Sequence, residues 1–130
     1  MKTKVGVGYS ENPDSKMAGI EAAQMAMQKA KIDSCNLAIL YATSKQDPVL
    51  LSEGVRSVIG SDSRLIGGYA LGIITKDFLA YEGYQVGIVV MKTESIIIDM
   101  FIEKGLSDNE YNTGVALGNQ IRNKKYKGEP

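Results

Sequence analysis

The chain has 130 residues, of which 44% are hydrophobic and 23% are charged, a composition typical of one globular domain with a real hydrophobic core. Fifteen basic and fifteen acidic residues leave no net charge, which argues against a general nucleic-acid or anionic-membrane binder, because both classes depend on a cationic surface. The sequence contains no histidine, which excludes Ser-His-Asp and Cys-His catalysis and the commonest zinc sites.

The first predicted element is a strand with one nearly bare face. Residues 5–9 alternate apolar side chains with Gly6 and Gly8. The two glycines also begin a dinucleotide fingerprint, but Glu11 stands where the third glycine belongs, and no phosphate-binding P-loop motif occurs elsewhere. The sequence therefore favours packing of a helix against the bare strand face over a nucleotide site.

A helix rich in small residues follows the turn at residues 12–15, which supplies its caps, and runs to about Lys31. Gly19, Ala23 and Ala26 fall on one stripe of this helix, together with Ala30. Such a stripe predicts that the helix axis approaches the sheet closely. Glu21 lies opposite the stripe, so we expect a solvated or interfacial carboxylate.

The middle of the chain predicts two further strands around a second helix. Leu37 to Thr43 is an apolar run suited to a buried strand. Asp47-Pro48 is a cap followed by proline at the first helical position, and the helix that it opens ends at Gly60. Leu65 to Thr75 is expected to form a third strand, and residues 76–84 a loop.

The last part of the chain predicts two strands and a helix. The strands are Gln85 to Met91 and Ser95 to Ile102, and a capping box at Ser107 to Glu110 opens the helix. The order is therefore βαβαβββα in a single α/β domain, or α+β by a stricter label. We expect a mixed sheet with packed helices, parallel in the early βαβ units and antiparallel in the later strands.

The candidate ligand-binding residues gather at strand ends and in a glycine cluster. Ser10, Thr43 and Ser44 follow the first two strands, at the sheet edge where ligands of parallel sheets usually bind. Capping and turn hydrogen bonds are an equally good interpretation of these hydroxyls. Gly67 and Gly68 permit close approach of a ligand, or equally of another backbone.

The order and spacing of several short motifs, from Val5 to about Arg122, resemble the FIST N-terminal domain, a prokaryotic sensory module thought to bind small ligands. The segments that carry the resemblance are Gly8-x-Ser10, Ala18-Gly19-x-Glu21-Ala22-Ala23, Thr43-Ser44, Ile66-Gly67-Gly68, Tyr81-Glu82-Gly83 and the apolar strand from Val86. The chain is thus identified as a freestanding FIST N-like domain over residues 1–124, with a flexible tail at 125–130.

The resemblance implies non-catalytic binding of a small polar metabolite, such as an amino acid. We expect no cofactor and no metal. The expected site residues are Ser10, Thr43, Ser44, Gly67 and Gly68, with Tyr69 as one wall. A separate signalling partner is expected, and binding to nucleic acid or membrane is not.

The alternative is a structural or interaction module that forms a homodimer without a ligand. The run 96–98 is three consecutive isoleucines, so the strand that contains it needs apolar cover on both faces. An enzymatic function is disfavoured, because the sequence shows neither two carboxylates at a spacing typical of a catalytic pair nor a cluster of metal ligands.

Localisation is expected to be cytoplasmic. Cys35 is the single cysteine, so it forms no intrachain disulfide, and it is expected to be a buried, inert thiol. The start of the chain lacks a signal-peptide pattern, and the most apolar region, 86–102, is interrupted by Lys92, Glu94 and Asp99.

Overall fold

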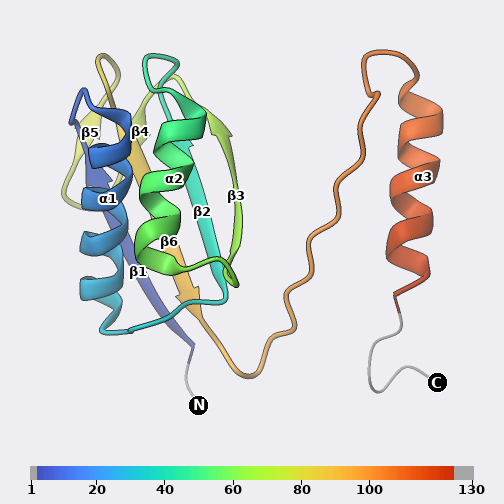
Figure 1. The fold of residues 1–130 in the computed structure, drawn as a ribbon, viewed down its shortest axis with the longest axis horizontal. Coiled ribbons are helices and arrows are strands. Elements are labelled where there is room, and N and C mark those ends of the chain that lie inside the picture. Colours follow the sequence, from blue (N-terminus) through green and yellow to red (C-terminus); the bar gives the residue numbers. More distant parts are fainter. Residues whose placement is uncertain (1–2, 125–130) are drawn as a thin grey trace. The chain divides into compact units, whose positions relative to one another are not determined.

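The structure, a computed structural model, describes residues 3–124, so the predicted tail at 125–130 lies outside the described residues (Figure 1). It confirms the α/β class with a mixed sheet and packed helices. The chain divides into two units, one ending at Ile98 and one beginning at Asp99. The elements are β1 (Lys4–Ser10), α1 (Ser15–Ala30), β2 (Leu37–Ala42), α2 (Pro48–Ile59), β3 (Arg64–Tyr69), β4 (Ile73–Ile74), β5 (Leu79–Ala80), β6 (Val86–Lys92) and α3 (Glu110–Arg122).

The main sheet has the strand order β1-β6-β2-β3. β2 and β3 run parallel, whereas β6 is antiparallel to both of its neighbours, β1 and β2. This insertion of β6 has a consequence for the site, because Ser10 at the end of β1 and Ala42 at the end of β2 are both register partners of Val86. The carboxyl ends of β1 and β2 therefore flank the start of β6.

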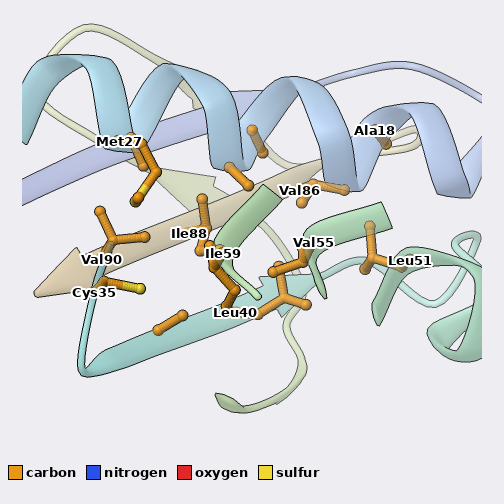
Figure 2. Close-up of a cluster of buried hydrophobic side chains, with 14 of the residues drawn as sticks. Ala18, Met27, Cys35, Leu40, Leu51, Val55, Ile59, Val86, Ile88 and Val90 are labelled. Atoms are coloured by element: carbon orange, nitrogen blue, oxygen red, sulfur yellow. The ribbon is translucent and has the colours of Figure 1, made fainter. Parts of the chain in front are cut away.

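Both helices of the first unit cover one face of the sheet, and Figure 1 shows them side by side. Each begins as predicted, with Asp14 capping α1 and Asp47 capping α2 before Pro48. In Figure 2 the core lies between α1, α2 and the inward side chains of β2 and β6. Its largest fully buried side chains are Ile88, Val55, Val86 and Val90.

The small residues of α1 serve two different contacts. Side chains on Gly6 and Gly8 would collide with the carbonyl oxygens of Ala26 and Ala22, so α1 lies directly on the backbone of β1. The predicted stripe is buried, but Gly19 faces α2 and not the sheet, because a side chain there would meet the backbone of α2. The bare strand face is thus filled by the helix, as the sequence favoured.

The third strand is shorter than predicted, and a small hairpin replaces part of it. β3 ends at Tyr69, and β4 and β5 then form a separate two-stranded sheet. The hairpin packs on the sheet face opposite the helices, where the Phe78 ring stacks on Tyr9 at 4.3 Å between centroids, and Ile73 lies against Gly87.

The predicted strand from Ser95 to Ile102 is wrong, since these residues form neither helix nor strand. A strand needs a neighbour for its backbone hydrogen bonds. β6 pairs on both sides, but its ladders end at Lys92, and residues 95–102 pair with no strand among the described residues. Apolar composition alone therefore does not make this segment a strand.

In the second unit, α3 is capped by Asn109 and not by the predicted Ser107 box, because the Asn109 side chain accepts from the Asn112 N–H at 2.8 Å. Gln120 ties the helix to the preceding segment through Glu103, at 2.8 Å. No residue of α3 is buried. Among the described residues, no helix has the length and apolarity needed to cross a membrane.

Candidate functional site

Buried polar side chains gather where the carboxyl ends of β1 and β2 flank the start of β6. Ser10, Thr43, Gln46 and Gln85 are all buried there. Most soluble domains keep such side chains at the surface, so each one needs a hydrogen-bond partner to offset its desolvation. We call these four residues, together with Glu11, Asn12, Glu21 and Glu82, the edge cluster.

Ser10 is held by the loop between β1 and α1 and by α1 itself. Its hydroxyl donates to Oε2 of Glu21 at 2.6 Å and accepts from the N–H of Asn12 at 3.1 Å. The Asn12 side-chain amide donates to the other oxygen of Glu21, Oε1, at 2.8 Å. Glu21 is exposed, in agreement with the expectation of a solvated carboxylate, but it also fixes this loop.

Thr43 and the two glutamines connect the neighbouring loops. The Thr43 hydroxyl donates to the carbonyl of Gly83 at 2.6 Å. Nε2 of Gln46 donates to the carbonyls of Asn12 and Tyr84, at 2.9 and 2.7 Å. Three loops that are distant in sequence, before α1, before α2 and before β6, are therefore joined by side-chain amide and hydroxyl bonds.

The glutamines were not predicted as site residues. Gln85 donates to the Glu82 carbonyl at 2.5 Å and to Oε1 of Glu11 at 3.3 Å, so it links the loop before β6 to the end of β1. The available signal was a glutamine at the first position of the predicted strand from Gln85 to Met91. Glutamine at such a position is usually solvated, and only the strand order buries it.

A pocket of about 280 Å³ opens beside the edge cluster. Thr43 and Ser44 line it together with Glu82, and Tyr81 contributes an aromatic side chain. Its remaining lining comes from the loops after β2, after β3 and before β6, through Lys45, Ala70, Leu71 and Gly83. The pocket thus combines hydroxyl, carboxylate and ammonium groups with an aromatic wall.

The predicted residues of β3 line a different pocket. Gly67, Gly68 and Tyr69 border a largely apolar space of about 280 Å³ beside α2. Gly67 is required by close packing, because a Cβ there would collide with the Leu40 carbonyl of β2, whereas none of the described residues packs within 4 Å of a Cβ at Gly68. The six predicted residues are therefore divided among the buried cluster, the pocket beside it and this apolar space.

Cys35 is buried, with its sulfur 3.4 Å from the Ser63 hydroxyl. Within residues 3–124, three or more Cys, Asp or Glu side chains do not come together in a group suited to a metal ion.

No protein-family model matches the chain, and no curated protein matches it. Among solved structures, the chain is similar to a point mutant of FtsZ from M. jannaschii, with 17% identity and a TM-score of 0.42. The match covers 70% of this chain and 27% of the FtsZ chain, so it spans about a quarter of that protein's length. A likeness this distant carries no argument about function.

Proposed function

We propose that this chain is a FIST N-like sensory domain that binds a small polar metabolite without transforming it. The observation that supports the proposal is the pocket of about 280 Å³ beside the edge cluster, which Thr43 and Ser44 line. Its volume lies just below the roughly 300–1,000 Å³ range of drug-sized ligands, which favours a compact metabolite such as an amino acid. Signalling passes to a separate partner, and the cytoplasm is the proposed compartment.

The pocket residues divide the work of recognition. The exposed Ser44 hydroxyl orients the ligand, while Thr43 uses its lone pairs, since its proton is donated to Gly83. Tyr81 takes the role of aromatic wall that was predicted for Tyr69, because Tyr81 lines this pocket and Tyr69 lines the other. Charged metabolite groups have Glu82 and Lys45 as complementary partners.

The test is a thermal-shift screen of the twenty amino acids, small dicarboxylic acids and sugars, followed by titration calorimetry of any hit. A ligand that binds only the folded state raises the unfolding midpoint in a concentration-dependent manner. Ser44→Ala is expected to weaken binding about tenfold by removing a hydrogen bond. Ser61→Ala is the matched control, because Ser61 is an exposed serine in the turn before β3. It precedes the amino end of β3, whereas Ser44 follows the carboxyl end of the parallel strand β2.

A panel that leaves the midpoint unchanged contradicts the proposal, and equal binding by the Ser44 and Ser61 variants contradicts this location of the site.

A specific observation supports a second candidate, a homo-oligomeric interaction module. The sheet face opposite the helices carries Val5, Tyr41 and Ile66, which are all about half exposed. β3 is an edge strand whose one charged residue is Arg64. Apolar side chains on an unprotected edge favour pairing with a second copy.

A further inference from the structure

Two buried acceptors of the edge cluster have no donor within residues 3–124. Gln46 is 2% exposed and Gln85 is 4% exposed, and Oε1 of each accepts no hydrogen bond from a described residue. Buried side-chain oxygens of this kind are normally paired. Both oxygens therefore point to a donor that the described residues do not provide.

Rotating either amide does not remove the mismatch. Nε2 of Gln46 already faces two backbone carbonyls, those of Asn12 and Tyr84. Nε2 of Gln85 faces the carbonyl of Glu82 and the carboxylate of Glu11. Exchanging nitrogen for oxygen would set oxygen against oxygen in both cases, so the hydrogen-bond network fixes the two orientations.

The charges around these amides identify the class of donor. Glu11, Glu21 and Glu82 all belong to the edge cluster, and the ion pairs among the described residues involve other carboxylates: Glu53, Asp77 and Asp99. Lys45 is the nearby cation, with Nζ 5.8 Å from the centroid of the Tyr84 ring. An environment of amide, carbonyl and carboxylate oxygens favours a positively charged donor over an anion.

We propose that the edge cluster binds a protonated amine, whose N–H groups pair with Oε1 of Gln46 and Gln85. The proposal rests on the proposed function and names the group by which the metabolite is held. A primary ammonium carries three donors, which suits two neutral oxygens and one carboxylate. Glu82 lines the pocket and also accepts from Nε2 of Gln85 through its backbone carbonyl, so the pocket and the two glutamines share this residue.

The experiment compares four chloride salts at equal ionic strength by thermal shift and calorimetry: methylammonium, tetramethylammonium, sodium and potassium. Methylammonium is expected to raise the unfolding midpoint of the full chain, and the other three are not. Tetramethylammonium has the same charge but no N–H donor, so this pair separates hydrogen bonding from charge. Gln85→Met is expected to weaken methylammonium binding about tenfold, because one charge-assisted hydrogen bond is lost.

Gln28→Met is the matched control, since Gln28 is an exposed glutamine on α1 and is expected to leave binding unchanged. If Gln85→Met fails to fold, the side-chain amide NMR signals of the unsubstituted protein test whether Gln46 and Gln85 contact methylammonium. Those of Gln46 and Gln85 are expected to shift during a methylammonium titration, while that of Gln28 stays in place.

Three outcomes overturn the inference. An equal rise of the unfolding midpoint with sodium or potassium indicates a simple cation site. An equal rise with tetramethylammonium indicates attraction by charge without hydrogen bonding. An unchanged midpoint with every salt leaves buried water as the partner of the two oxygens. If a carboxylate or sugar of the metabolite panel binds through Ser44 and methylammonium does not, the amine inference fails while the proposed function stands.

Discussion

Close packing at individual glycines and hydrogen bonds to one carboxylate, that of Glu21, stabilise the first unit. In β1, Gly8 permits the Ala22 carbonyl of α1 to rest on the strand backbone, a contact that any side chain would prevent. Overpacking of a close interface is destabilising because neighbours cannot move without breaking their own contacts. The two glycines Gly8 and Gly68 therefore differ sharply in their tolerance of a methyl group.

Gly8→Ala is expected to lower the free energy of unfolding by about 1–3 kcal/mol or more, because its new methyl group meets helix backbone. Gly68→Ala is the control and is expected to stay within about 0.5 kcal/mol, since nothing lies within 4 Å of the added carbon. Urea denaturation measures both values. Equal midpoints for the two variants would show that α1 does not rest on β1 in this way.

Glu21→Ala is expected to cost about 1 kcal/mol of unfolding free energy, although Glu21 is exposed. The reason is that the buried Ser10 hydroxyl loses its acceptor and Asn12 loses its tie to α1. Glu53→Ala removes an exposed ion pair with Lys16 and is expected to change stability by less than about 0.5 kcal/mol. Chemical denaturation that ranks Glu53→Ala at or above Glu21→Ala would contradict this role of Glu21.

At the scale of elements, few contacts hold the β4–β5 hairpin to the rest of the first unit. Each of its strands has two residues, and it holds to the main sheet through the Tyr9–Phe78 stack and through Ile73 against Gly87. Short elements with few buried contacts open locally at low free energy. The hairpin also borders the pocket proposed to bind the ligand, through Tyr81 and Glu82 that follow it.

Phe78→Leu is expected to speed amide hydrogen exchange in residues 73–80 several-fold, since an aromatic pair contributes roughly 0.5–1.5 kcal/mol beyond its buried area. Exchange in β6 is expected to stay unchanged, because that strand is paired on both sides. Leu79→Ala serves as the control, as Leu79 is more than half exposed. Unchanged exchange in the hairpin after Phe78→Leu would mean that the stack does not hold it.

At the scale of the whole molecule, the sheet face opposite the helices and the β3 edge are the surfaces through which we expect the chain to associate. The sequence predicted a homodimer paired through the strand from Ser95 to Ile102 or through a neighbouring helix, and that strand is absent. β3 has the property that was predicted for that strand, an apolar edge that is not paired within the described sheet. Its Ile66 side chain is 53% exposed. The predicted partner is therefore expected at β3.

We expect a two-fold dimer, with light scattering at micromolar concentration giving twice the chain mass of 14.1 kDa. Ile66→Lys is expected to give monomers, because a charge on an edge strand opposes pairing. Val49→Lys is the control, since Val49 is an exposed apolar residue on α2. A monomer without any substitution would contradict the dimer, and a dimer that survives Ile66→Lys would contradict the β3 interface.

The sequence by itself determined what depends on neighbouring residues. Helix starts were predictable from Asp47-Pro48, and the strands from Leu37 and from about Val86 followed from their apolar runs, because caps and periodicity act within a few residues. The burial of the small-residue stripe of α1 was predictable for the same reason. Of the edge cluster, Ser10 and Thr43 were predictable as polar residues at strand ends.

Only the tertiary structure decided what depends on long-range pairing. The placement of β6 between β1 and β2 brings Ser10 and Ala42 opposite Val86, and this buries Gln46 and Gln85 with oxygens that lack a donor among the described residues. Ser95 to Ile102, although apolar in composition, lie in neither sheet. Strand pairing joins residues that are distant in sequence and similar in composition, so no local pattern distinguishes an apolar segment that finds a neighbour from one that does not.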